Sequence, residues 1–366
     1  MEGTRPWIVM VGGFLGAGKT TLLLAAAREL ERRGMRSAVI LNDQGDALVD
    51  TQYAVLHHLP NGEVAGGCFC CRYSELTSVM EKVRVHSPDV IFAEPVGSCT
   101  DISATILHPL QELIDSYRIA PFTVLVDPKR GESLTSESAD ANLRFLFLKQ
   151  LEEADIVCFT KADIHQNYPE IGVGNVRRLS AKTGQGVSGW LDEVLSGRLS
   201  SGSSVLEIDY EQYAQAEASL AWLNLEATIL TDPPVSPAMV LGPIFDQLDA
   251  DFTTSRISIV HLKAIIRSES GFLKAAICHN GQQPDVEGAL DASPTRHHEL
   301  LLNLRATGEA EQVRSITERI FNRLGMEIAD LQMNCFHPAA PEPERRIWIG
   351  HANRSMTGAG EGIWTK

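Results

Sequence analysis

The stretch Gly13-Phe-Leu-Gly-Ala-Gly-Lys-Thr20 constrains the fold of this chain more than any other feature. It fits the pattern G-x-x-x-x-G-K-[ST], follows an apolar run at 7–13 that predicts a buried strand, and precedes a predicted helix at 22–30. Glycine N–H groups at a helix N-terminus can surround phosphate oxygens, Lys19 can reach the β- and γ-phosphates, and the Thr20 hydroxyl can ligate Mg²⁺. The motif therefore predicts a P-loop nucleotide site, and an ordinary glycine-rich turn is the weaker alternative.

The remainder of the first half predicts a parallel sheet. Continuous Val/Ile/Leu runs separated by helices are typical of strands that are buried on both faces. We expect a doubly wound α/β domain over residues 1–197, whose last helix covers 187–195. Its further strands are predicted at 37–43, 89–95, 122–128, 155–161 and 176–181.

The second half predicts a smaller α+β domain with an antiparallel sheet. A Ser/Gly-rich stretch begins the predicted linker at 198–218, and the C-terminal domain is expected over 219–338. The tail at 339–366 is rich in Pro, Gly and charge, so we expect it to be poorly ordered. Within the domain, we predict strands at 220–230 and 297–306, a hairpin of 256–268 with 271–279, and helices after Ser236-Pro237 and over 309–324.

Composition excludes several classes of partner and location. The chain has 366 residues and a formal charge of −15, which disfavours nucleic acid and anionic membrane surfaces. No apolar run approaches the roughly 20 residues that span a bilayer, and the N-terminal residues do not resemble a signal peptide. The 7 cysteines are odd in number and follow no regular framework, so we expect reduced thiols and a cytoplasmic protein.

Two later segments favour guanine as the base. Thr160-Lys161-Ala-Asp163 ends a predicted strand as the guanine-reading N-K-x-D loop does, with Asp163 placed to accept from guanine and Thr160 in place of the usual Asn. Ser180-Ala181-Lys resembles the S-A-K loop whose backbone N–H meets guanine O6. Either segment alone could be a plain turn, but in this order after a phosphate loop they favour GTP over ATP.

Two strand ends carry carboxylates that suit Mg²⁺. Glu94 follows a buried strand and can hold Mg²⁺ through water or position the attacking water, while Gly97 can approach the γ-phosphate. The alternative is an ordinary acidic residue at a strand end. Asn42-Asp43-Gln-Gly-Asp46 follows the second strand, and we interpret it as a nucleotide-sensing loop with Asp43 as the better Mg²⁺ ligand.

Three of the cysteines fall within Cys68-Phe-Cys70-Cys71. Such close spacing disfavours a disulfide, whereas clustered thiolates are soft ligands suited to Zn²⁺ (or another divalent transition metal), Cu(I) or similar ions. Three thiolates leave one position for water, His57, His58 or a client ligand; packing or redox sensing is the alternative. For the isolated cysteines we favour core packing, although Cys99 could approach the site. These residues are Cys99, Cys158, Cys278 and Cys335.

Together these segments resemble the CobW-like (cobalamin-synthesis W) GTPases, relatives of the nickel-insertion GTPases that mature urease and hydrogenase. The resemblance covers residues 7 to about 195 and rests on GGFLGAGKTT (12–21), LNDQGDALVD (41–50), GGCFCC (66–71), Glu94-x-x-Gly97 and Thr-Lys-Ala-Asp (160–163). It implies a GTPase that binds a transition metal through the cysteines and couples its release to GTP hydrolysis. By resemblance, phosphate and Mg²⁺ are held by Gly13, Gly16, Ala17, Gly18, Lys19, Thr20 and Thr21.

The implied partner is a client metalloprotein or a cofactor-dependent enzyme that receives the metal or metallocofactor. The sequence is also compatible with a homodimer that forms around the nucleotide. Two other classes of protein fit part of the pattern: a small-molecule kinase with the same phosphate loop, and a non-enzymatic module in which the cysteines hold a structural zinc ion. Nucleotide hydrolysis in the absence of any phosphate acceptor would argue against the kinase. The absence of phosphate release would favour the non-enzymatic module.

Overall fold

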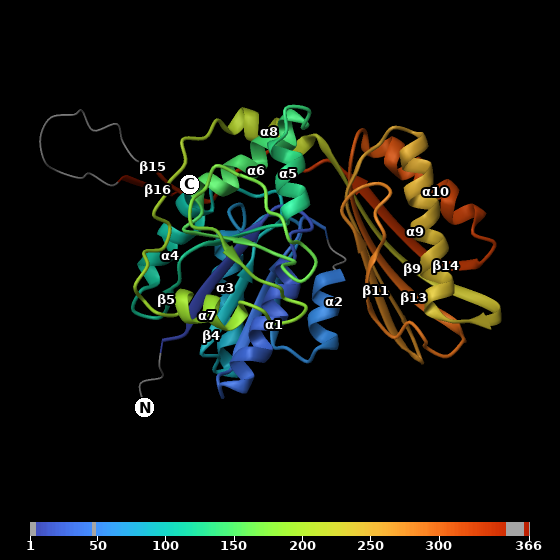
Figure 1. The fold of residues 1–366 in the computed structure, drawn as a ribbon, viewed down its shortest axis with the longest axis horizontal. Helices are drawn as coiled ribbons and strands as arrows, with labels where there is room; N and C mark the ends of the chain where they lie inside the picture. The colour runs from blue at the N-terminus through green and yellow to red at the C-terminus, as the bar shows by residue number, and fades with distance from the viewer. Residues whose placement is uncertain (1–4, 46–48, 349–361, 366) are drawn as a thin grey trace, which may run out of the picture. The chain divides into compact units, whose positions relative to one another are not determined.

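The computed structural model describes residues 5–45, 49–348 and 362–365, and it divides the chain into two compact units (Figure 1). The first unit comprises residues 1–44, 54–216 and 340–366, and the second comprises 45–53 and 217–339. No helix among the described residues is long and apolar enough to cross a membrane.

A parallel sheet forms the centre of the first unit, with the strand order β3-β2-β4-β1-β6-β7-β8 and a short β5 beside β1. The strands are β1 Trp7–Gly13, β2 Ser37–Asn42, β3 Asn61–Val64, β4 Val90–Glu94, β5 Arg118–Ile119, β6 Thr123–Val126, β7 Ile156–Phe159 and β8 Arg177–Arg178. This is the predicted doubly wound sheet; β3 and β5 were not predicted.

Helices cover this sheet. The apolar residues of α1 and α7, Leu22 and Trp190 among them, pack in one core with strand residues such as Val9 and Phe92. The helices that lie wholly or partly in this unit are α1 Lys19–Arg32, α2 Val49–Leu56, α3 Tyr73–Val83, α4 His108–Leu110, α5 Pro128–Thr135, α6 Ala141–Glu153, α7 Val187–Val194 and α8 Tyr210–Ala218, with short turns η1 Arg84–His86, η2 Ser103–Leu107 and η3 Gln111–Leu113. Helix α8 lies within the segment predicted as a linker.

The second unit has an antiparallel sheet in the order β12-β11-β10-β13-β9-β14, with α9 and α10 packed on one face (Figure 1). The elements are β9 Leu220–Val235, α9 Pro237–Thr254, β10 Ile259–Ser268, β11 Gly271–Ile277, β12 Asp285–Gly288, β13 Thr295–Thr307, α10 Ala310–Arg323 and β14 Glu327–Phe336. The predicted fold class is therefore confirmed for both units, while β12 and β14 were not predicted.

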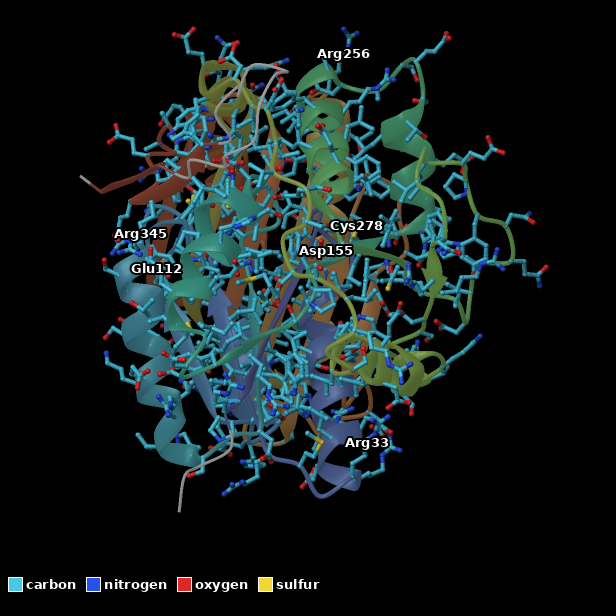
Figure 2. The ribbon with its side chains drawn as sticks, turned by 90° about the vertical axis from the view of Figure 1, so that its left-hand side faces the viewer. Arg33, Glu112, Asp155, Arg256, Cys278 and Arg345 are labelled. Carbon is cyan, nitrogen blue, oxygen red and sulfur yellow. The ribbon has the colours of Figure 1, made fainter. Side chains whose placement is uncertain are left out.

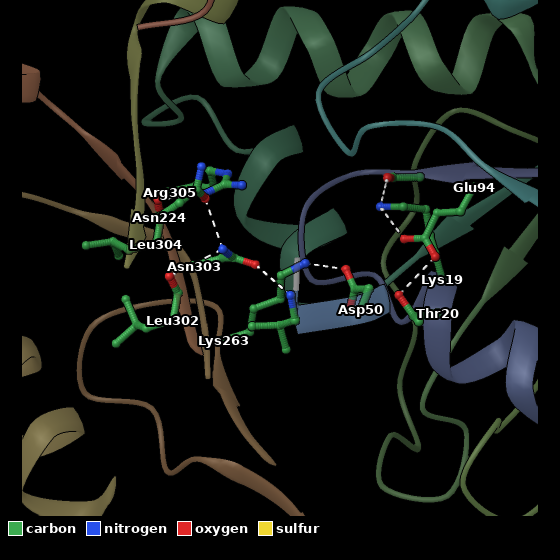
Figure 3. Close-up of polar contacts among 12 residues, drawn as sticks. Lys19, Thr20, Asp50, Glu94, Asn224, Lys263, Leu302, Asn303, Leu304 and Arg305 are labelled. Carbon is green, nitrogen blue, oxygen red and sulfur yellow. Dashed lines mark hydrogen bonds and ion pairs between the residues drawn. The ribbon is translucent and has the colours of Figure 1, made fainter. Parts of the chain in front are cut away.

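Residues 45–53 leave the first unit and belong to the second. The Val49 N–H donates to Asn303 Oδ1 at 3.1 Å, and Lys263 forms an ion pair with Asp50 (Figure 3). The first turn of α2 is thus fixed to β13 and β10 of the antiparallel sheet.

Candidate nucleotide and metal site

The phosphate loop has the backbone geometry that its glycines predict. Helix α1 begins at Lys19, and the residue before it, Gly18, has φ 90°. At Gly13, φ is 130° and an added Cβ would lie 2.4 Å from the Leu125 carbonyl oxygen. Only glycine tolerates such a conformation and such an approach without strain. The Lys19 ammonium donates to the Gly13 carbonyl at 2.9 Å, which folds the side chain over the loop.

Lys19, Thr20 and Glu94 meet where β1 and β4 end. The Thr20 hydroxyl donates to Glu94 Oε2 at 2.9 Å, and Lys19 Nζ lies 3.9 Å from Glu94 Oε1 (Figure 3). All three side chains are buried. A hydroxyl, an ammonium and a carboxylate at a helix N-terminus form a set that can bind phosphate and a hard cation.

Gly97 also lies against the phosphate loop. An added Cβ would be 2.8 Å from Leu15 Cδ2 and 3.0 Å from Lys19 Nζ, so the backbone approaches the lysine closely only because Gly97 has no side chain. The Gln150 amide fixes the loop after Gly97 by donating to the carbonyls of Gly97 and Cys99 at 3.0 and 2.9 Å. Sequence reasoning missed Gln150, since its partners lie 53 and 51 residues away.

The residues predicted to read guanine lie on two adjoining turns. The Ala162 N–H donates to the Leu179 carbonyl at 3.1 Å, which joins the turn of Thr160, Lys161 and Asp163 to the turn of Ser180 and Ala181. Thr160 and Ser180 are buried, Lys161 and Ala181 are partly buried, and Asp163 is exposed.

Asp127 is a residue of this region that sequence reasoning missed. Its carboxylate accepts from the N–H groups of Lys129 and Arg130 at the start of α5 and lies 2.7 Å from Lys161 Nζ. Burial raises the pKa of Asp127, but Lys161 and the helix donors outweigh burial and leave its pKa lowered. The sequence does contain a signal for this residue, because Asp127-Pro128 after a strand is typical of a helix N-cap followed by proline at the first helical position.

The three predicted cysteines form one thiol cluster, defined here by the Sγ atoms of Cys68, Cys70 and Cys71. Cys68 Sγ lies 2.9 Å from Cys70 Sγ and 3.1 Å from Cys71 Sγ, and the remaining pair is 3.8 Å apart. Four Zn–S bonds of about 2.3 Å place neighbouring sulfurs about 3.8 Å apart, so one ion fits this cluster after a small expansion. Within the described residues, no other group of three Cys, His, Asp or Glu ligand atoms is so close.

The thiols differ in acidity. Hydrogen bonds with Cys70, Cys71 and Cys99 lower the pKa of Cys68 well below its usual range, whereas the hydrogen bond with Cys68 raises the pKa of Cys71 to about 12. The hydrogen bonds therefore favour the thiolate form of Cys68 over that of Cys71. The structure does not bring His57 or His58 into the cluster; His57 Nδ1 lies 3.1 Å from Arg28 Nη2.

Asn42 positions the cysteine loop, which we define as residues 65–72. Its Nδ2 donates to the carbonyls of Val64 and Gly67 at 2.8 and 2.7 Å, and its Oδ1 accepts from the Phe69 N–H at 2.9 Å. Asp43 follows directly, is also buried, and donates its N–H to Val64 at 3.4 Å. Asp46, the other carboxylate of the predicted sensing loop, lies outside the described residues.

A second support comes from the C-terminal strap, defined as residues 340–348. The Glu342 N–H donates to Cys71 Sγ at 3.2 Å, and the Glu344 N–H donates to the Cys70 carbonyl at 3.0 Å. The Glu344 carboxylate also accepts from Ser74 N at 2.8 Å, in the first turn of α3. The strap ends in β15 Arg345–Trp348, which pairs with β16 Gly362–Thr365, and Arg345 pairs with Glu112 (Figure 2).

Buried carboxyl groups hold the segment that follows Gly97. Glu153 accepts from the Thr100 hydroxyl at 3.0 Å and from Ser103 N at 3.1 Å, and Asp101 forms a buried ion pair with Arg346 of the strap at 2.6 Å. Burial, and then the charge of Asp101, raises the pKa of Glu153 to about 8. These contacts fix the backbone of residues 100–103, which follow Gly97 in the chain.

Residues 7–181 match the sequence model of the CobW/HypB/UreG nucleotide-binding domain. The chain is 27% identical to a zinc chaperone CobW of Pseudomonas aeruginosa, with 43% of this chain and 48% of that protein covered. It is 24% identical to zinc-regulated GTPase metalloprotein activator 1 of Dictyostelium discoideum, with 43% and 40% covered. The match therefore spans about half the length of these curated relatives or less.

Two solved structures are also similar. Zn(II)-bound YjiA GTPase from Escherichia coli is 15% identical, with 87% of this chain and 99% of that chain covered and a TM-score of 0.32. HypB from Helicobacter pylori in complex with nickel is 15% identical, with 56% and 92% covered and a TM-score of 0.40. At these TM-scores the likeness is too distant to assign a role to any residue.

Proposed function

We propose that this chain, whose residues 7–181 are a nucleotide-binding domain of the CobW/HypB/UreG family, is a GTP-hydrolysing metallochaperone. It binds Zn²⁺, or another divalent transition metal, through Cys68, Cys70 and Cys71. It delivers the metal or a metallocofactor to a client protein. The zinc chaperones among its relatives support zinc as the first choice of metal.

One observation carries the proposal: Asn42, which holds the cysteine loop, stands one residue before Asp43 at the end of β2. Strand β2 pairs with β4 so that Leu41 lies opposite Glu94, and Glu94 accepts a hydrogen bond from Thr20 of the phosphate loop. We therefore expect a shift at the phosphate end to reach the thiols through the ends of β2 and β4, which are adjacent. Such a connection is what coupling between two binding sites needs.

The chemistry follows from the residues that meet at this edge of the sheet. Lys19 binds the β- and γ-phosphates, and the Gly97 N–H meets the γ-phosphate. Mg²⁺ would be held by Thr20 with Asp43 and Glu94 and would neutralise charge on the phosphates. Glu94 orients the attacking water, because its carboxylate already lies beside the phosphate loop.

Guanine recognition occupies the two adjoining turns. Asp163 accepts from the guanine N1–H and amino group, and its exposure leaves it accessible to the base. Lys161, held by Asp127, covers the base, and the backbone of Ser180 and Ala181 meets guanine O6. Thr160 directly follows β7, and its N–H donates to the Val126 carbonyl at 2.9 Å.

Single-turnover hydrolysis tests the nucleotide part. With Mg²⁺ and GTP, Lys19→Ala should lower the rate on the order of 100-fold, the usual loss for a group that stabilises transition-state charge. Lys82→Ala, an exposed lysine of α3, should hydrolyse GTP at the wild-type rate. Equal rates in the two variants would remove the phosphate-loop assignment, and transfer of phosphate only to a small-molecule acceptor would favour a kinase.

Metal competition tests the carrier part. The reduced protein is titrated with zinc against a chromogenic chelator, with and without a non-hydrolysable GTP analogue. We expect one thiolate-bound ion per chain and an affinity that changes with the analogue. Unchanged affinity would leave a structural zinc site, and no bound metal would make the cluster a packing feature.

A further inference from the structure

The C-terminal strap contacts the thiol cluster at the member that is most exposed to solvent. Cys68 and Cys70 are buried, with exposures of 4% and 1%, whereas Cys71 is partly exposed. The Glu342 N–H of the strap donates to Cys71 Sγ at 3.2 Å, and the preceding residue, Pro341, is buried. A cation that reaches or leaves the cluster on the Cys71 side therefore has to pass the strap.

Hydrogen bonds hold the strap against the cysteine loop and the start of α3. The Glu344 N–H donates to the Cys70 carbonyl at 3.0 Å, and the Glu344 carboxylate accepts from Ser74 N at 2.8 Å and from Ser74 Oγ at 2.6 Å. The bonds to Ser74 are exposed, and each such bond contributes little net stability because water competes for the same groups. This end of the strap can therefore detach unless the strap is also fixed elsewhere.

A buried ion pair fixes the strap two residues further on. Arg346 Nε lies 2.6 Å from Asp101 Oδ2, and the two side chains are only 9% and 1% exposed. The Tyr210 hydroxyl donates to the same carboxylate oxygen at 2.7 Å. Removing one member of a buried ion pair leaves the other charge uncompensated, whereas an exposed pair contributes little. The Asp101–Arg346 pair therefore holds the strap more strongly than the more exposed pair of Arg345 and Glu112.

We propose that the strap is a removable cover of the metal site and that the Asp101–Arg346 pair is its latch. While the pair is intact, the Glu342 N–H supports the Cys71 sulfur and the strap blocks that side of the cluster. When the pair separates, the strap leaves Cys71, and the metal can exchange with ligands of another molecule. The inference rests on the proposed function, because it concerns how a carrier retains its metal and then releases it.

The rate of zinc release tests the cover on the zinc-loaded full chain. Zinc is transferred to an excess of a chromogenic chelator, and stopped-flow absorbance follows the transfer. Arg346→Ala should release zinc at least about 10-fold faster than wild type, because loss of one member of a buried ion pair shifts the latch equilibrium by more than this factor. Arg177→Ala is the matched control and should release zinc at the wild-type rate, since it breaks a partly buried pair with Glu193 between β8 and α7.

Glu344→Ala is a second variant, which leaves no buried charge and decides the question if Arg346→Ala does not fold. It weakens the attachment to Ser74 and should release zinc about 5-fold faster, the factor that corresponds to a typical hydrogen bond. In the metal-free, reduced protein, iodoacetamide should also alkylate Cys71 faster in both strap variants than in wild type or Arg177→Ala. Mass spectrometry of the Cys71 peptide measures this rate.

Two results would overturn the proposal, and they can be told apart. Wild-type rates of zinc release in the strap variants would show that the strap does not control the metal, and would leave the metallochaperone function intact. A wild-type protein that binds no zinc through its cysteines would instead overturn the metal-carrier function, and the cover with it.

Discussion

Replacing Asn42 by Ala gives the most direct test of how the cysteine loop is held. The side chain is buried and makes three hydrogen bonds to backbone groups of Val64, Gly67 and Phe69. Each such bond contributes about 0.5–1.5 kcal/mol net, and leaving a buried N–H without a partner costs about 1–3 kcal/mol. We therefore expect the loop to lose roughly 2–4 kcal/mol of local stability.

The matched control is Asn61→Ala on the neighbouring strand β3. Asn61 is partly buried, and the structure gives its side chain one hydrogen bond, to the Leu59 carbonyl at 2.9 Å. Its loss should cost about 1 kcal/mol and leave the cysteine loop in place.

Amide hydrogen exchange of peptides covering residues 61–72 measures the local effect, because exchange reports opening of one segment without global unfolding. Zinc competition measures the functional effect, and Asn42→Ala should bind zinc about 10- to 100-fold more weakly, as when a group supporting metal ligands is removed. If Asn42→Ala and Asn61→Ala exchanged at the same rate and bound zinc equally, Asn42 would not organise the site.

Three further outcomes follow from the same structure. The pKa of Glu153 is raised from 4.5 to about 8 by burial and Asp101, so the folded state keeps a proton that the unfolded chain releases. The free energy of unfolding should therefore fall as pH rises through this range, and Glu153→Gln should flatten the decline in urea titrations at pH 6 and 8. Glu344→Ala removes an anion from the N-terminus of α3 and should lower the free energy of local opening there by about 1 kcal/mol. Faster amide hydrogen exchange in the first turn of α3 would measure this change. Asp50→Ala leaves the Lys263 ammonium largely buried without this carboxylate and should destabilise the second unit by about 3 kcal/mol, measured by urea unfolding of the full chain; an unchanged midpoint would contradict it.

Local signals made much of the fold predictable. The buried strands of the first unit are continuous apolar runs, and the phosphate-loop motif predicts the turn between β1 and α1. The hairpin of β10 and β11 closes with Ser268 opposite Gly271, as its two-residue turn predicts. The resemblance to the CobW-like GTPases, which rested on these motifs, is confirmed for the nucleotide-binding domain.

Elements without a local signal could not be predicted. Strand β3 is four residues long and contains a glycine and a glutamate, and β14 at the sheet edge has no regular alternation of buried and exposed residues. Their strand structure depends on neighbours that are distant in sequence. The same holds for the site: Asn42 bonds residues 22 to 27 positions away, and Glu342 reaches Cys71 across 271 positions. No sequence motif identifies such distant partners, whereas the spacing of the three cysteines could be recognised in the sequence itself.

The segment that begins at Asn42 connects more than the thiols to the nucleotide. Its first residue is fixed to the cysteine loop, and its continuation at Val49 and Asp50 is fixed to the antiparallel sheet of the second unit. Asp43, the proposed Mg²⁺ ligand, stands between these two attachments. If Mg²⁺ and the γ-phosphate draw Asp43 toward Thr20, we expect the movement at Asp43 and Gln44, beyond the end of β2, because β2 itself is buried and paired on both sides. Asn303→Ala removes the acceptor of the Val49 N–H, together with the Asn303 donor to Asn224 Oδ1 and the Leu302 carbonyl. This variant should leave zinc affinity in the absence of nucleotide unchanged while altering the effect of a GTP analogue on it. Equal nucleotide effects in Asn303→Ala and wild type would confine the coupling to the first unit.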